Sequence, residues 1–109
     1  TLLKADVHHL PFENNYFDYA VTTEAFHHYY DQQLALREMN RITKKGGKVI
    51  VSDINFLLRP AHWLFQKFEP GCVNINSKKE MRKLFKKTGL KNIRQSRNFL
   101  FAVMTIGEK

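Results

Sequence analysis

The succession of strand, helix and strand in the first half of the chain constrains the fold more than any other feature. Residues 17–23 mix aromatic and β-branched side chains, a composition typical of a strand. Residues 32–43 carry apolar side chains at helical spacing. Residues 48–54 contain the run Val49-Ile50-Val51, which indicates a strand buried on both faces. Two strands connected through a helix run parallel, because tight hairpins join only antiparallel strands, and the sequence therefore predicts an α/β fold.

The ends of the predicted helices carry the residues that helix ends favour. Asp31 is a suitable N-cap for the helix of residues 32–43, and Gly46-Gly47 is expected to end that helix. The segment Ser77-Lys78-Lys79-Glu80 has the spacing of a capping box, and Gly89 stands where a helix C-terminus favours glycine. These signals predict a second helix that is more clearly marked than the first.

Weaker patterns complete the set of predicted elements. Residues 2–5 have the character of the end of a buried strand. Pro60 fits the first turn of a short helix. Residues 92–95 and 99–106 predict two antiparallel strands that are joined near residues 96–98. The chain shows no linker composition and no internal repeat, so these elements are expected to form one unit.

Length and composition limit the class of protein. With 109 residues, 43% of them hydrophobic, the chain is long enough for one core. No apolar run approaches the roughly 20 residues that cross a bilayer, and the N-terminus lacks the pattern of a signal peptide. The single cysteine, Cys72, cannot form an intrachain disulfide. A cytoplasmic location without membrane association is therefore expected.

The chain has a formal net charge of +8, and its basic residues are densest in the predicted helix between Ser77 and Gly89. The basic residues that fill the positions left by its apolar stripe are Lys78, Lys79, Arg82, Lys83, Lys86 and Lys87. Such a face is most often simply solvated, which is our first interpretation. The alternative is a nucleic-acid surface, whose affinity would fall steeply with salt. No nucleic-acid-binding motif accompanies the cluster, so nucleic acid is not favoured as a partner.

Polar residues follow each predicted strand of the first half. In an open α/β sheet, ligands bind beyond the carboxyl ends of the strands, where Asp6-Val7, Thr23, His27-His28 and Asp53 are expected to lie. A carboxylate followed by a backbone N–H can bind the amine and a ring nitrogen of adenine. Aspartate is also common in turns, so a loop cap is an equal alternative for Asp6.

The histidines and aromatic residues have two interpretations each. The possible metal ligands are His8-His9, His27-His28, His62 and Cys72. No pair of them has the spacing of a known zinc motif, so no metal site is expected. His27 and His28 either take part in a reaction or pack at the start of a helix. The aromatic residues that either line an acceptor pocket or bury a helix face are Tyr29, Tyr30, Trp63, Phe65 and Phe68.

Six segments of the first half, taken in order, carry a family signature. They are Lys4-Ala5-Asp6-Val7, Leu10-Pro11-Phe12, Tyr16-Phe17-Asp18, His27-His28, Arg37-Glu38-Met39-Asn40-Arg41 and Gly46-Gly47. In this order and at these spacings they resemble class I S-adenosylmethionine-dependent methyltransferases, in particular the small-molecule enzymes related to ubiquinone and menaquinone biosynthesis. The resemblance implies the C-terminal part of a Rossmann-like fold, a mostly parallel sheet that ends in an antiparallel strand pair.

The resemblance also implies a larger parent domain. The glycine-rich loop and the ribose-binding acid of the family precede the matched region, and residues 1–109 do not contain them. We therefore expect residues 1–109 to be a single partial domain. The family's strand order would place two further strands between the predicted strands of residues 2–5 and 17–23. Without them a hydrophobic strand edge is open, which favours self-association or a partner chain at that edge.

The resemblance assigns a role to each polar position. Asp6 and Val7 match the pair that contacts the adenine of the cofactor. Thr23 matches a small polar residue near the methionine part, and His28 matches a polar position near the transferred methyl group. If the acceptor needs a general base, His28 is the first candidate, because the pKa of histidine lies near neutrality. Asp53 is the second catalytic candidate, and His27 and Glu24 are weaker ones.

The implied function is methyl transfer from S-adenosylmethionine to a small-molecule acceptor that the sequence does not identify. The methyl group is already activated on the cofactor, so the protein mainly aligns the two reactants. The isolated 109 residues are expected to bind the cofactor weakly or not at all. The alternative is a non-catalytic basic module or a truncated subunit that contacts nucleic acid or a partner chain.

Overall fold

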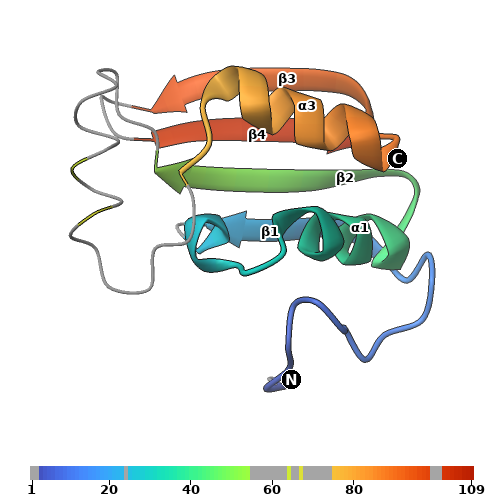
Figure 1. Ribbon diagram of the computed structural model, residues 1–109. Coiled ribbons are helices and arrows are strands. Elements are labelled where there is room, and N and C mark those ends of the chain that lie inside the picture. Colours follow the sequence, from blue (N-terminus) through green and yellow to red (C-terminus); the bar gives the residue numbers. More distant parts are fainter. Residues whose placement is uncertain (1–2, 24, 55–63, 65–66, 68–74, 99–101) are drawn as a thin grey trace.

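The computed structural model contains one four-stranded sheet with two longer helices on one of its faces (Figure 1). It describes residues 3–23, 25–54, 64, 67, 75–98 and 102–109. The elements are β1 (Phe17–Thr23), the 3-10 helix η1 (Phe26–His28), α1 (Gln32–Ile42), β2 (Thr43–Ile54), α3 (Lys78–Thr88), β3 (Lys91–Asn98) and β4 (Ala102–Glu108). The strand order is β1-β2-β4-β3, which confirms the predicted α/β class.

The sheet is parallel on one side and antiparallel on the other. β1 pairs with β2 in parallel, with Ala20 opposite Val49, as the strand–helix–strand pattern predicted. β4 lies between β2 and β3 and is antiparallel to both. The predicted antiparallel pair is therefore confirmed, although residues 96–98 belong to β3 and the connection falls on residues 99–101, which lie outside the described residues.

The predicted helix of residues 32–43 forms, but it ends earlier than expected. The Asp31 carboxylate accepts a hydrogen bond from the backbone N–H of Leu34 at 3.0 Å, which confirms the N-cap. The helix ends at Ile42, and Thr43 already pairs with β1. The prediction that Gly46-Gly47 ends the helix is wrong, because both glycines lie within β2.

The two glycines instead allow β2 to bulge beside β1. The register jumps from Phe17 opposite Thr43 to Tyr19 opposite Lys48. Gly46 has a φ of +84°, which glycine adopts without strain. A Cβ on Gly47 would lie 2.5 Å from the carbonyl oxygen of Asp18, so only glycine fits this approach of the two strands.

The second helix matches its prediction. The hydroxyl of Ser77 accepts a hydrogen bond from the N–H of Glu80, and the Glu80 carboxylate accepts one from the N–H of Ser77. Gly89 ends α3 in the left-handed conformation, with a φ of 91°. Met81 and Phe85 are buried, and the lysines of the helix are exposed.

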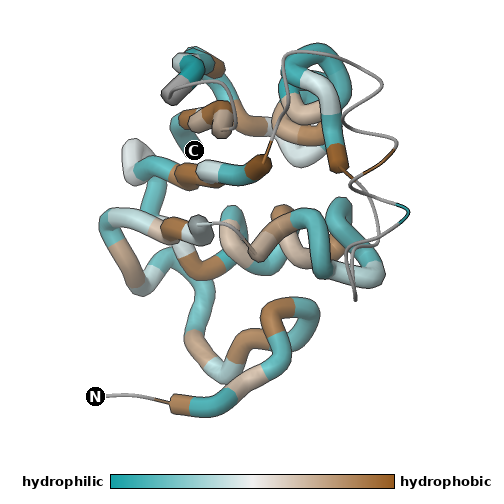
Figure 2. Tube along the Cα trace, turned by 90° about the vertical axis from the view of Figure 1, so that its left-hand side faces the viewer, coloured by the Kyte–Doolittle hydropathy of each residue, from teal (hydrophilic) through white to brown (hydrophobic). Residues whose placement is uncertain are grey.

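The core lies between the sheet and the two helices. α1 and α3 cover the same face of the sheet (Figure 1), and hydrophobic positions occur in both the strands and the helices (Figure 2). The buried apolar cluster consists of Ala20, Phe26, Leu36, Met39, Val49, Val51, Met81, Phe85 and Leu90. On β1, by contrast, Tyr19 is 61% exposed and Val21 is 58% exposed.

Two predicted elements fall partly on residues that the structure does not describe. The strand predicted for residues 2–5 is wrong for the described residues 3–5, which form no strand, and Leu3 is exposed. A strand needs a paired neighbour, and in the described sheet β1 pairs only with β2. The helix predicted from Pro60 falls on residues of which only 64 and 67 are described, both helical. Of the described helices, none has the length and apolar character that a membrane span requires.

Candidate functional site

The candidate site begins with a buried pair at the carboxyl ends of β1 and β2. η1 follows β1 directly, and Asp53 is the penultimate residue of β2. The Nδ1 atom of His27 lies 2.7 Å from the Oδ1 atom of Asp53. The His27 residue is 2% exposed and Asp53 is 4% exposed, so the bond is shielded from water. The two parallel strands thus bring an imidazole and a carboxylate together inside the fold.

Burial dominates the electrostatics of Asp53. Loss of hydration raises the pKa of its carboxyl above the usual value. The hydrogen bond from His27 and the backbone N–H groups of Ile54 and His27 lower the pKa in part. Because these donors do not offset burial fully, the pKa of Asp53 stays above its usual value.

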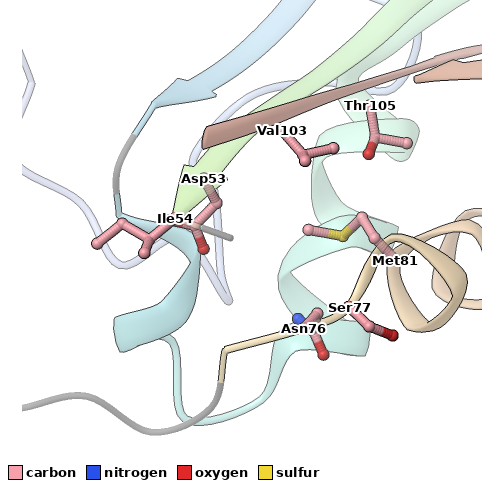
Figure 3. Close-up of a pocket in the computed structure, with 7 residues that line it drawn as sticks. All are labelled: Asp53, Ile54, Asn76, Ser77, Met81, Val103 and Thr105. Carbon is pink, nitrogen blue, oxygen red and sulfur yellow. The ribbon is translucent and has the colours of Figure 1, made fainter. Parts of the chain in front are cut away.

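A small cavity borders the Asp53 side chain (Figure 3). Its volume is about 10 Å³, close to the minimum for one water molecule. The lining residues are Asp53, Ile54, Asn76, Ser77, Met81, Val103 and Thr105. Asn76 donates to the side chain of Gln32 at 3.0 Å, and Gln32 donates to the carbonyl oxygen of Phe26 at 3.1 Å. A polar network therefore connects the start of α3, the start of α1 and η1.

Thr23 and His28 lie at the same end of the sheet but at its surface. Both residues are exposed. The imidazole of His28 contacts that of His27, with ring centroids 4.0 Å apart. The structure thus brings His27, His28 and Asp53 together, with only His28 accessible from outside. Glu24, the remaining weaker candidate, lies outside the described residues.

Asp6 caps its own loop. Its Oδ1 atom accepts hydrogen bonds from the backbone N–H of His8 at 2.9 Å and from the His8 Nδ1 at 2.7 Å. These bonds, the backbone one first, lower the pKa of the carboxyl. The side chain of Asp6 nevertheless stays exposed, and its Oδ2 atom has a longer contact of 3.4 Å with the hydroxyl of Tyr30. Asp6 therefore caps its loop, and its adenine role stays a prediction.

His8 fastens this loop to the beginning of α1. The residue is buried, and its Nε2 atom accepts a hydrogen bond from the backbone N–H of Asp31 at 3.3 Å. Its ring stacks on Tyr30 with centroids 3.7 Å apart. The Nδ1 atom therefore carries the proton donated to Asp6. Nothing in the sequence pattern singled out His8 for this role, since its partners come from a different element.

Val7 lines a hollow beside β1. The hollow has a volume of about 280 Å³ and is bordered by Val7 and Leu10 from the loop, Thr22 from β1, and Tyr29. The hydroxyls of Thr22 and Tyr29 are hydrogen-bonded at 2.8 Å. This size approaches the lower end of small-molecule pockets, and its lining is mostly apolar with one polar pair.

The sequence interpretation missed His27 as the partner of Asp53. The sequence does place both residues after neighbouring parallel strands. Whether His27 or His28 pairs with Asp53 depends on the direction in which each ring points. Asn76 gave no signal in the sequence. Among the described residues, no three histidine, cysteine or acidic side chains are grouped as a metal site would require.

Known proteins with similar sequence or structure include methyltransferases. Residues 1–51 match the family model described as a methyltransferase domain. The structure superposes on a Thermotoga maritima S-adenosylmethionine-dependent methyltransferase, a possible histamine N-methyltransferase, with a TM-score of 0.80 and 23% identity over 98% of this chain and 63% of that one. Together, the family-model match over residues 1–51 and the shared fold support a class I S-adenosylmethionine-dependent methyltransferase domain.

Two relatives are similar in sequence. Demethylmenaquinone methyltransferase of Staphylococcus aureus is 29% identical over 85% of this chain. An uncharacterized protein of Escherichia coli is 45% identical over 49% of this chain. The chain spans 48% of the length of the first relative and 24% of the second.

Proposed function

We propose that the protein transfers the methyl group of S-adenosylmethionine to a small-molecule acceptor, with this chain as part of a larger parent domain. The observation that carries the proposal is the gathering of Thr23, His28 and the His27–Asp53 pair at the carboxyl ends of β1 and β2, in a methyltransferase fold. The sequence relative named as a demethylmenaquinone methyltransferase supports a small-molecule acceptor.

The described residues fit one side of such a cofactor. Asp6 is exposed and keeps one carboxylate oxygen with only a long contact, so it can accept a further donor such as the adenine amine. Val7 borders the hollow beside β1. We assign Asp6 and Val7 to the adenine, and Thr23 to the methionine part. Bound here, the cofactor supplies a methyl group that needs no further activation.

His28 is assigned to the acceptor side. It is exposed, it ends η1, and an imidazole exchanges protons near neutral pH. When the acceptor atom carries a proton, His28 accepts it as the acceptor binds the methyl group. Asp53 is buried and bonded to His27, so the acceptor does not reach it in this arrangement. The chain's main contribution is to hold the reactants in line.

Titration calorimetry with S-adenosylhomocysteine tests the assignment of Asp6 in the full-length protein. The Asp6→Ala variant should bind about tenfold more weakly, because it loses a hydrogen bond to a charged group. Glu13→Ala is the matched control, since Glu13 is an exposed acid of the same loop. Absence of binding by the unsubstituted protein would contradict the function, and equal affinities of the two variants would contradict the role of Asp6.

A further inference from the structure

His27 is a buried titratable group that the proposed reaction does not use. Its bond to Asp53 joins the short turn η1 to the last residues of β2. Enclosing an imidazole and a carboxylate costs hydration free energy, and such pairs often stabilise a fold no better than apolar residues would. The pair therefore needs an explanation other than stability.

We propose that His27 is a positioning residue, which holds η1 on Asp53 and so fixes His28 at the carboxyl end of the sheet. The inference rests on the proposed function, in which His28 flanks the transferred methyl group. His27 does not touch the reactants in this role, and it acts through the neighbouring residue.

The turn that carries His28 has little rigidity of its own. Its closing backbone bonds run from the N–H of His28 to the carbonyl oxygen of Ala25 at 2.9 Å and from the N–H of Tyr29 to that of Phe26 at 3.1 Å. One turn of 3-10 helix with two such bonds is too short to be stable alone. Tertiary anchors must therefore hold it in place.

The anchors lie on one side of the turn. Phe26 is fully buried in the core, and its carbonyl oxygen accepts the bond from Gln32. His27 adds the bond to Asp53, which lies opposite Val103 of β4 in the body of the sheet. Asp53 is itself fixed by backbone N–H groups of Ile54 and His27. The side chain of His27 thus connects the turn to β2 through a side-chain acceptor that is itself held in place.

The position of His28 follows from this connection. The His28 ring packs against the His27 ring at 4.0 Å between centroids, with an angle of 42° between the planes. A shift of the His27 ring therefore moves the surface on which His28 rests. Misplacement of a reacting group by about 1 Å is enough to reduce a rate by about 100-fold.

Two substitutions of His27 separate the hydrogen bond from the ring. In His27→Asn the side-chain amide keeps a donor near the position of Nδ1, whereas His27→Leu has a similar volume and no donor. Both variants lack the imidazole, so its direct effect on the signals of His28 is the same in each. The NMR signals of the His28 ring are recorded on the full-length protein. The control variant is His9→Asn, because His9 is an exposed histidine.

The proposal predicts that the His28 signals of His27→Leu are shifted and broadened relative to those of His27→Asn, with a methyl-transfer kcat at least about tenfold lower and an unchanged KM for the cofactor. Coincident His28 signals in two folded variants would overturn it. If His27→Leu does not fold, Asp53→Asn is compared with the unsubstituted protein. Movement of the His28 signals then supports the proposal, and its absence overturns it.

The same spectra separate this inference from the proposed function. Addition of S-adenosylhomocysteine to the unsubstituted protein should shift the His28 signals. If the ligand binds without moving them, His28 does not lie at the reacting end, and the assignment of the base fails. The comparison of the His27 variants is made without ligand, so it judges the positioning role independently.

Discussion

Arg41 and Glu38 hold the loop that presents Asp6 and Val7. The guanidinium of Arg41 donates to Glu38 at 2.7 Å, and it also donates to the carbonyl oxygens of Leu10 at 2.9 Å and Phe12 at 2.7 Å. The Glu38 carboxylate in turn accepts the backbone N–H of Leu10 at 2.9 Å. One helix-borne ion pair thus satisfies several backbone groups of a loop that has no regular structure. The family signature at these two positions has a structural cause.

The ion pair makes the stability of the fold depend on pH. The hydrogen bond from Arg41 lowers the pKa of Glu38 below its usual value of 4.5. A lowered pKa in the folded state means that Glu38 contributes stability above pH 4.5, which is lost as the pH falls through the folded value. Urea unfolding between pH 7 and pH 3 should therefore show a smaller loss of stability for Glu38→Gln than for the unsubstituted protein. Parallel curves for the two proteins would contradict this account.

At the scale of elements, the bulge of β2 depends on Gly47. An added Cβ would meet the carbonyl oxygen of Asp18 at 2.5 Å and the Cγ2 of Thr43 at 2.7 Å, and the backbone atom cannot move aside. Gly47→Ala should lower the free energy of unfolding by about 2–3 kcal/mol. Gly46→Ala is the control, because a Cβ there meets nothing within 4 Å and only the positive φ costs about 1 kcal/mol. Equal losses in thermal or urea unfolding would refute the steric explanation.

The excess positive charge of the chain lies on α3 and β3. Residues 75–98 contain nine of the 18 basic residues and one acid, so the remainder of the chain is formally neutral. The apolar stripe of α3 faces the core, and most of the basic side chains are exposed. We expect a solvated face. Replacing Lys79, Lys83 and Lys86 by glutamine should change the affinity for S-adenosylhomocysteine by less than about twofold, because surface charges at a distance are screened.

The alternative, a basic binding module, predicts that the exposed basic residues bind a charged ligand. It requires tight binding to a DNA duplex, with an affinity that falls steeply between 50 and 200 mM salt. Fluorescence anisotropy with a labelled duplex measures this directly. A steep salt dependence that the triple glutamine variant abolishes would favour the binding module over the solvated face.

At the scale of the whole molecule, the sequence predicts those features that depend on residues adjacent in the chain. Asp31, Ser77 and Gly89 act on their own neighbours, and their predicted roles at helix ends are confirmed. Gly46-Gly47 suits a helix end and a strand bulge equally well, and only the approach of β1 decides between them. The pairing of His27 with Asp53 and of His8 with Asp31 depends on side-chain directions between elements, which no spacing in the chain encodes.

The outer edge of β1 has the character of a pairing surface. β1 ends the described sheet, and Tyr19 and Val21 on it are largely exposed. We propose that a strand of the parent domain or a second copy of the chain pairs there, since an apolar edge strand is prone to association. Sedimentation of the 109-residue chain should show concentration-dependent association that Val21→Lys reduces. A chain that stays monomeric at all concentrations would contradict this proposal.

We propose that the methyl group of the cofactor lies beside His28 and that the adenine lies beside Val7. The most direct measurement is the set of intermolecular nuclear Overhauser effects between the full-length protein and S-adenosylmethionine that carries a ¹³C-labelled methyl group. We expect contacts from the labelled methyl group to the His28 ring and from the adenine to the methyl groups of Val7. Binding that places the labelled methyl group away from His28 and the adenine away from Val7 would contradict it.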